Sequence, residues 1–316
     1  MTAVHASTPD VTVVIPTRNR ARQIGECLQS LRAQSLTNFE VLVMDQSDDD
    51  GTEGQVEVLA DGRVRFIRVP RRGANPARNL GAARAAAPII AFLDDDCSAP
   101  GDWLAQIADA FDSDPDLQFI FGQLKAPPHD TTLGSVPEFL PEASWQRRRG
   151  KRRVAMVAAG ANMAARKSFL LEIGGFDELL GPTVPDISDC SISFKVLRSG
   201  AKWVASPEIE VIHTSGFREH AQLANVYQSY GRELGLTYGR FVRRGDPYAL
   251  WCFAAEQAEM GIGCLRALAR TGHPRGAKTM VAHARGFVCG LRLPGELGHV
   301  TGGQLRKMAR SRTLTP

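Results

Sequence analysis

Three consecutive aspartates, Asp94 to Asp96, directly follow the apolar run Ile89 to Leu93. Carboxylates this close together repel one another unless a cation neutralises them. Mg²⁺ and Mn²⁺ take oxygen ligands, which protein carboxylates commonly share with the phosphates of a substrate. The three aspartates therefore predict a divalent-metal site for a phosphate-bearing ligand, although such a cluster taken alone also fits a solvated acidic loop.

Other polar clusters follow apolar runs in the same way. The runs are separated by segments with helical spacing, a pattern that predicts βαβ units and a parallel sheet covered on both faces. The carboxyl ends of parallel strands share one edge, where open α/β sheets bind ligands. The expected strands are Val11 to Ile15, Phe39 to Met44, Val64 to Val69 and Ile89 to Leu93, and the polar clusters after them begin at Pro16, Asp45, Arg71 and Asp94.

Five short motifs occur in a fixed order within residues 11 to 213. They are Val13 to Thr17 with Asn19-Arg20, Val43 to Ser47 with Gly51-Thr52, Gly73 to Gly81, Leu93 to Asp96, and Ala159 to Ala164 with Gly174 to Glu178. Each motif is a weak signal by itself, but their order and spacing resemble glycosyltransferase family 2. The resemblance implies an α/β fold of the GT-A type, with a Rossmann-like, mostly parallel sheet between helices, followed by a C-terminal helical region.

The resemblance also implies a nucleotide diphosphate-sugar donor, a UDP-sugar by default, with Mg²⁺ or Mn²⁺ as the cofactor. Asp45 would face the base or ribose, Arg78 opens a helix whose N-terminus can face phosphate, and Asp96 would bind the metal directly. Gln46 stands where many members have a second aspartate, so thymidine and guanosine stay open as donor bases. The expected donor-binding residues are Pro16, Thr17, Arg18, Asp45, Arg78, Asp94 and Asp95, and the expected metal ligands are Asp94, Asp96 and His213.

Inverting sugar transfer needs a general base for the acceptor hydroxyl. The family places it in a Glu-Asp-x-Asp helix start, and Ser188-Asp189-Cys190-Ser191 occupies that position here, without the flanking acids. Asp189 is therefore the expected catalytic base, with Asp186 as the second candidate, while an ordinary helix N-cap is the alternative for Asp189. The expected acceptor-side residues are Asn162, Gly175, Phe176 and Asp177.

The chain is expected to divide into a catalytic domain, residues 1–214, and a helical region, residues 215–316. The catalytic domain would comprise a nucleotide-sugar half, about residues 11–121, and an acceptor half, about residues 122–214. A helix is expected near 189–199 and a strand near 208–212, followed by helices near 223–243, 248–271 and 277–293. The basic run Arg147 to Arg153 fits either a solvated loop or a phosphate-binding loop.

Charge is distributed unevenly between the two regions. Residues 1–214 carry 23 lysines and arginines against 28 acidic residues, and the remaining residues carry 15 against 6, so the regions have net charges of −5 and +9. No nucleic-acid-binding motif accompanies the basic part, and nucleic acid is not an expected partner. Peripheral contact of basic amphipathic helices with an anionic membrane and packing against other protein surfaces are equally compatible with the pattern.

The cellular setting is expected to be the cytoplasm, with possible contact with the inner face of the plasma membrane. Six cysteines occur without metal-site spacing, and the start of the sequence lacks the pattern of a secretion signal. A carbohydrate or a lipid-linked molecule, such as one used in cell-envelope polysaccharide synthesis, would be the acceptor. The sequence identifies neither the sugar, the acceptor nor the oligomeric state.

Two other functions fit parts of the pattern. A nucleotidyltransferase could share the sheet and the acidic metal site, but Pro16 to Asn19 is not the glycine-rich phosphate loop that such an enzyme normally needs. A non-catalytic protein that binds nucleotide sugars would explain the missing acids around Asp189. Turnover of a nucleotide sugar distinguishes this alternative from an enzyme.

Overall fold

The computed structural model describes residues 8–70, 72–141, 145–146, 160–180 and 189–294. The strands of the main sheet are β1 (Val11–Thr17), β2 (Phe39–Asp45), β3 (Val64–Arg68), β4 (Ile89–Leu93), β5 (Cys97–Ser98), β6 (Leu117–Lys125), β8 (Trp145–Gln146), β9 (Asn162–Arg166) and β10 (Lys202–His213). They are ordered β3-β2-β1-β4-β9-β6-β10-β5, and β8 pairs with β10. The first four strands are parallel, as expected, and all bring their carboxyl ends to one edge.

The second half of the sheet is mixed. Strand β9 lies antiparallel between β4 and β6, and β5 pairs antiparallel with the end of β10. Strands β6 and β10 are parallel, but their register shifts between Ser206 and Glu210. The sheet is therefore mostly parallel, and β5 brings the residues just after Asp96 beside His213 at the end of β10.

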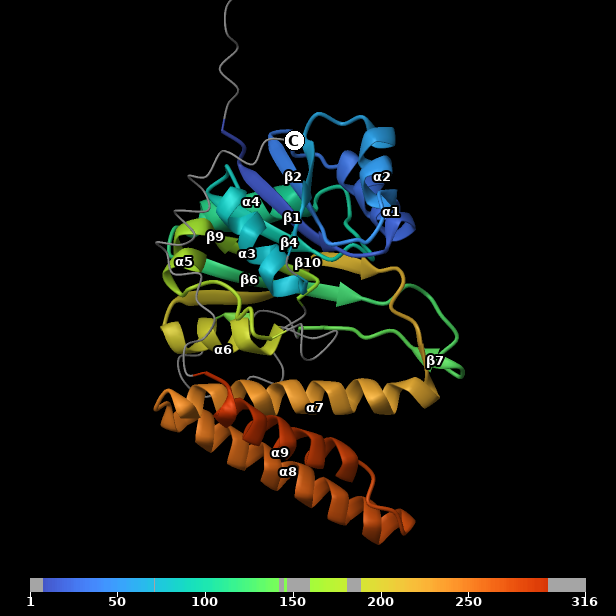
Figure 1. Ribbon diagram of the computed structural model, residues 1–316, viewed down its shortest axis with the longest axis vertical. Helices are drawn as coiled ribbons and strands as arrows, with labels where there is room; N and C mark the ends of the chain where they lie inside the picture. Colours follow the sequence, from blue (N-terminus) through green and yellow to red (C-terminus); the bar gives the residue numbers. More distant parts are fainter. Residues whose placement is uncertain (1–7, 71, 142–144, 147–159, 181–188, 295–316) are drawn as a thin grey trace, which may run out of the picture.

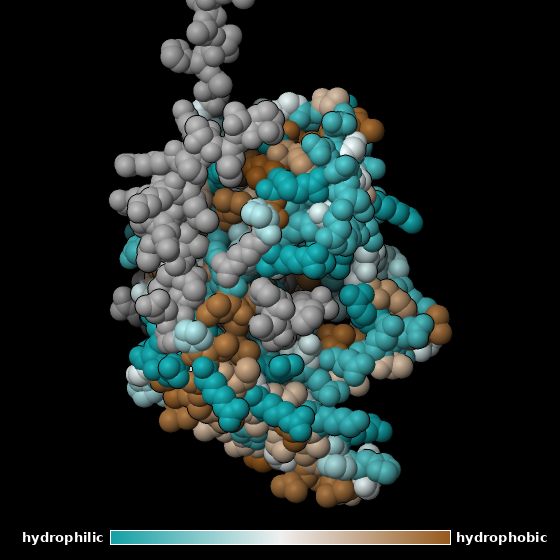
Figure 2. All heavy atoms as spheres, viewed as in Figure 1, coloured by the Kyte–Doolittle hydropathy of each residue, from teal (hydrophilic) through white to brown (hydrophobic). Residues whose placement is uncertain are grey.

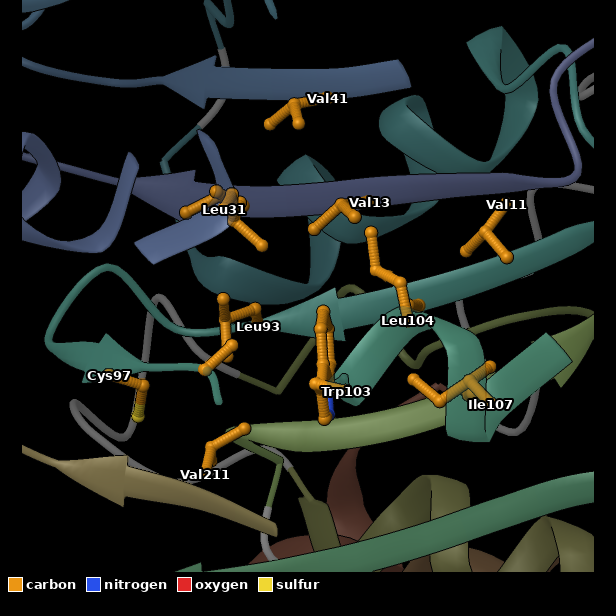
Figure 3. Close-up of a cluster of buried hydrophobic side chains, with 14 of the residues drawn as sticks. Val11, Val13, Leu31, Val41, Leu93, Cys97, Trp103, Leu104, Ile107 and Val211 are labelled. Carbon is orange, nitrogen blue, oxygen red and sulfur yellow. The ribbon is translucent and has the colours of Figure 1, made fainter. Parts of the chain in front are cut away.

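Helices cover both faces of the sheet (Figure 1). They are α1 (Ala21–Arg32), α2 (Gly51–Leu59), α3 (Ala74–Arg84), α4 (Trp103–Ser113), α5 (Lys167–Glu172) and α6 (Asp189–Ser199). One core cluster joins α1, α2 and α4 to the sheet, and the other joins α3, α5 and α6 to its opposite face. Consecutive strand residues alternate between the clusters, so Val13 lies beside Leu104 of α4 in Figure 3 whereas Val14 packs on α3.

Close packing positions α3 against the strands that end at the site. A Cβ atom at Gly81 would overlap the side chain of Val14 and would press on Met44. Glycine thus allows α3 to lie directly on β1 and β2. This contact fixes the helix that carries Arg78, three residues earlier.

Three long helices follow the sheet: α7 (His220–Arg243), α8 (Pro247–Thr271) and α9 (Ala277–Arg292). Their bounds agree closely with the expected helices. Before them, β11 (Arg218–Glu219) pairs with β7 (Gly134–Ser135). Helix α7 lies beneath α6 in Figure 1, and Phe194 of α6 packs on Tyr238 and Phe241 of α7.

Helices α7 and α9 pack with their backbones in contact. Cβ atoms at Gly235 and Gly239 of α7 would overlap carbonyl oxygens of α9, and those at Gly286 and Gly290 of α9 would overlap carbonyl oxygens of α7. Helix α8 starts at Pro247 with Asp246 as its side-chain N-cap, and it ends at the left-handed Gly272. No helix in the described part of the chain is long and apolar enough to cross a membrane.

Candidate functional site

The predicted polar clusters meet at the carboxyl edge of β1, β2 and β4. Thr17 at the end of β1 donates a hydrogen bond of 2.7 Å from its Oγ1 to Oδ2 of Asp95. Arg20 donates from one guanidinium nitrogen to Asp95 at 2.9 Å and to Asp96 at 3.0 Å. The guanidinium of Arg20 thus neutralises part of the charge of the aspartate cluster. Arg20 lies within the first motif, but its residue type and position there do not predict this role.

The environments of Asp95 and Asp96 shift their pKa values in opposite directions. Burial raises the pKa of Asp95 to about 6, and Arg20 and Thr17 only partly oppose this. Burial would also raise the pKa of Asp96, but the hydrogen bond and charge of His213, together with Arg20, lower it overall. Asp96 is thus held as a carboxylate.

His213 lies beside Asp96, as the metal-site prediction requires. Its Nε2 is 3.5 Å from Oδ2 of Asp96, and its Nδ1 is 3.3 Å from the carbonyl oxygen of Pro137. Burial lowers the pKa of His213, but the contact with Asp96 outweighs this and raises it overall. The backbone N–H and the Oγ1 of Thr214 both donate to the carbonyl oxygen of Asp96 at 2.9 Å, which fixes the end of β10 to the aspartate cluster.

The donor set suits a metal that shares its ligands with a substrate. No group of three or more His, Cys, Asp or Glu side chains within the described ranges forms a ready-made metal site. Asp96 and His213 provide two adjoining ligands, and hard divalent cations often complete such a set with water and substrate phosphates. The residues therefore fit Mg²⁺ or Mn²⁺ bound together with a diphosphate.

Arg78 connects the aspartate cluster to the expected base. Its guanidinium is buried and donates to Asp94 at 2.8 Å, to Asp189 at 3.3 Å and to the carbonyl oxygen of Gly160 at 3.2 Å. The N–H of Gly160 donates to the other oxygen of Asp189 at 2.8 Å. Both carboxylate oxygens of Asp189 thus bond to groups outside its own helix, unlike those of a simple N-cap.

Asp189 has the environment of a tuned acid-base group. Burial raises its pKa, the cation of Arg78 opposes this, and the charge of Asp94 adds to the rise. Asp186, the second candidate, lies outside the described residues. The same holds for the basic run Arg147 to Arg153.

The end of β2 forms the side of the site that is expected to face the nucleobase of the donor. Asp45 is buried, with one oxygen accepting from Ser47 at 2.6 Å and the other from Arg68 at 3.0 Å. Both polar atoms of the Gln46 side chain bond to the backbone of Gly73, at 3.0 and 3.1 Å. The Gln46 carbonyl therefore already accepts one hydrogen bond in tying β2 to the start of α3, which weakens the expectation that it accepts from a donor base. Pro16 lies near the end of β1, and Arg18 is exposed and lies 3.6 Å from Asp48.

Residues 12–177 match the family model described as Glycosyl transferase family 2, which covers just over half of the chain. The chain belongs to glycosyl transferase family 2. This finding confirms the resemblance drawn from the five motifs.

Curated relatives of this family match parts of the chain. A glucosyl-dolichyl phosphate glucuronosyltransferase from Haloferax volcanii is 26% identical over 182 residues, which are 54% of this chain and 57% of the relative. Glycosyltransferase AglE from the same organism is 37% identical over 101 residues, 30% of this chain and 33% of the relative. The chain therefore spans about a third to somewhat over half of these relatives.

Solved structures confirm the GT-A-like fold. The mannosyltransferase PcManGT from Pyrobaculum calidifontis, in complex with GDP-Man and Mn²⁺, aligns with a TM-score of 0.58 at 18% identity, over 90% of this chain and 88% of its own. Residues 1–349 of TarS from S. aureus, in complex with UDP-GlcNAc, align with a TM-score of 0.56 at 18% identity, over 72% of this chain and 66% of that one. Identities this low support the fold alone.

The expected acceptor-side residues of this family member have internal partners. Asn162 is buried and bonds to Trp103 and to the carbonyl oxygens of Gln123 and Ile209. Gly175 has a φ of +59°, and the N–H and carbonyl groups of Phe176 both bond to the side chain of Asn79. Asp177 accepts from the buried Arg240 of α7 at 2.7 Å. These contacts hold the segment beside the site, and direct contact of the four residues with an acceptor stays a prediction.

Helix α7 brings a further acid next to the expected base. Glu233 is buried and accepts at 3.3 Å from the N–H of Cys190, the residue after Asp189. Burial, followed by the charge of Asp189, raises the pKa of Glu233 well above its ordinary value. No sequence signal points to this contact, because Glu233 lies 44 residues beyond Asp189 in a helix outside the family motifs.

Proposed function

We propose that the chain transfers a sugar from a nucleotide diphosphate donor to an acceptor with inversion at the anomeric carbon. The observation that carries this proposal is the shared contact of Arg78 with Asp94, in the donor-side cluster, and Asp189, the expected base. A metal-binding cluster and a base held close to one another meet the two demands of inverting transfer.

The donor would lie along the carboxyl edge of β1, β2 and β4. Asp45 and Thr17 would line the base and ribose, Pro16 and Arg18 would lie in the adjoining turn, and Arg78 with Asp94 and Asp95 would adjoin the ribose and diphosphate. Asp94, Asp96 and His213 would hold Mg²⁺ or Mn²⁺. The bound cation would offset the negative charge that develops on the leaving diphosphate. UDP is the default nucleotide that the family resemblance implies, and GDP and dTDP stay open.

Asp189 would act as the general base. Its carboxylate would accept the proton of the acceptor hydroxyl while that oxygen forms a bond to the anomeric carbon of the sugar. The bond from the anomeric carbon to the diphosphate oxygen breaks with its electron pair, and the nucleoside diphosphate leaves. Arg78 holds Asp189 in place and favours its charged form.

The acceptor would be a carbohydrate or a lipid-linked molecule. A relative named as acting on glucosyl-dolichyl phosphate supports a lipid-linked acceptor, and another named for succinoglycan biosynthesis supports a polysaccharide precursor. An enzyme for either class would work in the cytoplasm, and for a lipid-linked acceptor at the inner face of the plasma membrane.

Product analysis with the full chain tests the proposed function. Incubation with UDP-sugars or GDP-sugars and Mn²⁺ should release the nucleoside diphosphate, even by slow hydrolysis, and Asp189→Asn should lower this release by about 10²- to 10⁴-fold. Release of pyrophosphate in a reaction with a nucleoside triphosphate would identify a nucleotidyltransferase instead. Binding of the nucleotide sugar without any turnover would support the non-catalytic alternative.

A thermal-shift panel would identify the donor nucleotide. A ligand that binds only the folded chain raises its melting temperature, and the rise grows with the ratio of ligand concentration to Kd. UDP, GDP and dTDP, each with and without Mn²⁺, should show one nucleotide with a metal-dependent shift. Equal shifts for all three would contradict recognition of the base at Asp45.

A further inference from the structure

An apolar strip runs along the outside of the α8–α9 hairpin. Trp251, Ala254, Ala258, Ile262 and Leu265 recur every three to four residues along α8 and are exposed. The side chains of Trp251 and Leu265 are 53% and 67% exposed, which is high for residues of this size. Further exposed apolar residues adjoin the strip on both helices: Leu250, Leu268, Val281 and Val288.

Contacts inside the hairpin show that the strip faces away from the catalytic part. Helix α8 turns Ala249 and Cys252 toward α7 and α6, and it turns Phe253 and Gln257 toward α9. The exposed apolar positions continue around α8 on the side opposite Cys252. In Figure 1 the hairpin forms the layer farthest from the sheet, and Figure 2 shows hydrophobic and hydrophilic spheres side by side at this end of the molecule.

Positive charge surrounds the strip. Within residues 247–294, six lysines and arginines are exposed, whereas Glu259 is the single exposed acidic residue. None of the six forms an ion pair with any residue that the structure describes. Arg266 lies beside the strip on α8, Arg270 lies one turn beyond it at the end of the helix, Arg275 lies in the turn, and Lys278, Arg285 and Arg292 share the exposed side of α9 with Val281 and Val288.

Two arginines of α7 have partners within the fold. Arg240 is buried in an ion pair with Asp177, and Arg243 donates to the carbonyl oxygen of Leu291 at 2.7 Å. These arginines support the fold. Arg232 and Arg244 are also exposed, on α7 and just after it, but six of the exposed basic residues in the described part of the helical region lie on the α8–α9 hairpin, around exposed tryptophan, leucine, isoleucine and valine.

We propose that the outer face of the α8–α9 hairpin docks on the surface of an anionic lipid bilayer. Amphipathic helices with tryptophan and leucine on one side and arginine or lysine on the other lie in the plane of the membrane interface. Trp251, Ile262 and Leu265 enter the boundary between head groups and acyl chains, and the six cations contact anionic head groups. Docking deepens the proposed function by naming the surface where a lipid-linked acceptor is met, but it needs neither donor nor acceptor.

Vesicle binding of the full chain tests the proposal. Vesicles of phosphatidylglycerol and phosphatidylcholine in equal parts should carry the protein into the pellet at low salt, with less binding at high salt and little to phosphatidylcholine alone. Arg266→Gln with Arg270→Gln should weaken binding roughly 25-fold, because each basic residue near an anionic surface contributes a factor of about five. Arg22→Gln with Arg32→Gln, which removes two exposed arginines of α1, is the matched control and should leave binding unchanged.

A second pair of variants tests the apolar strip. Leu265→Ser should weaken binding to the same vesicles, whereas Val58→Ser, at an 82% exposed position on α2, should not. Both positions are exposed, so thermal melting should confirm that both variants remain folded. Trp251 fluorescence, isolated by comparison with Trp251→Phe, should shift to the blue when vesicles are added.

Two results would overturn docking on lipid. One is equal binding of Arg266→Gln/Arg270→Gln and the unmodified chain to anionic vesicles, or no binding by either. The other is a protein that sediments as a dimer, becomes a monomer on Leu265→Ser and ignores vesicles, which would assign the strip to a second copy of the chain. Donor turnover is measured without vesicles, so failure of docking leaves the proposed transferase activity to its own test.

Discussion

At the scale of single residues, the site depends on a buried guanidinium placed between two carboxylates. Arg78 neutralises part of the charge on Asp94 and Asp189 and holds both in position. The family motifs predict all three residues as site residues. The contact between them is not predicted, because Arg78 and Asp189 are separated by 111 residues and neither motif refers to the other.

Replacing Asp96 tests the metal site. We expect Asp96→Ala to abolish metal-dependent binding of UDP with little loss of stability, because the carboxylate would hold a cation rather than pack. Calorimetric titration with UDP in the presence of Mn²⁺ measures this. Asp116→Ala, an exposed aspartate at the far end of the sheet, should bind as the unmodified chain does. Unchanged affinity of Asp96→Ala for UDP with Mn²⁺ would show that Asp96 is not a metal ligand.

The pH dependence of transfer tests Asp189. A general base must be deprotonated, so kcat/KM should fall as the pH drops through the pKa of Asp189. Burial raises this pKa, and the acid limb should therefore lie at a higher pH than the value of about 3.9 typical of aspartate. Asp189→Asn should lose the limb along with most of the rate. A limb that persists in Asp189→Asn but disappears in Asp95→Asn would belong to Asp95, whose pKa is raised to about 6.

At the scale of elements, the sequence predicts the first four strands, the helical segments between them and helices α6 to α9, but not helix α5 or strand β6. Strand β10 was expected near 208–212 but begins at Lys202, because Ser206, Pro207 and Glu208 interrupt its apolar pattern where the register shifts. Strand β9 was not predicted. Its sequence, Asn162 to Arg166, contains no β-branched or aromatic residue and forms a strand because β4 and β6 flank it.

Glycine at the α7–α9 contact is the feature of these elements most sensitive to substitution. A methyl group at Gly235 would overlap the carbonyl oxygen of His283, so Gly235→Ala must separate the two helices. We expect a loss of about 1 to 3 kcal/mol in the free energy of unfolding, typical of overpacking. Urea denaturation would measure it.

Gly263 provides the matched control in α8. A Cβ atom there meets no other atom within 4 Å, so Gly263→Ala should stabilise the helix by up to about 1 kcal/mol through helix propensity. Equal effects of the two substitutions would show that α7 and α9 are not in close contact. A stabilising effect of Gly235→Ala would also show that α7 and α9 are not in close contact.

At the scale of the whole molecule, the helical region is joined to the catalytic part through buried polar contacts. Arg240 of α7 pairs with Asp177, and Glu233 of α7 contacts the start of α6. The division of the chain after Thr214 stays a prediction. The buried contacts show that removing the helices would expose charged groups beside the site.

The Arg240–Asp177 pair gives a measurable form of this connection. Loss of one partner of a buried ion pair typically costs about 3 to 5 kcal/mol. We expect Arg240→Ala to lower the free energy of unfolding by an amount of this order and to reduce transfer as well, because Asp177 lies in the segment beside the site. Arg243→Ala, at an exposed position about one helical turn after Arg240, should lower the free energy of unfolding by less than about 1 kcal/mol. Similar losses for both variants would contradict the special role of the buried pair.

The stacked arrangement of α6, α7 and the α8–α9 hairpin also determines the distance between Asp189 and the outer face of the hairpin. Packed helices lie about 8 to 10 Å apart, so Asp189 at the start of α6 stands roughly 20 Å above the outer face of the hairpin. If that face binds a bilayer, the proposed catalytic base Asp189 would lie at this distance from the membrane surface. Acceptors whose reactive hydroxyl projects on the order of 20 Å from the lipid surface would be within reach, and those seated at the head groups would lie too low. Helices α7, α8 and α9 would then select acceptors by their length as well as by their chemistry.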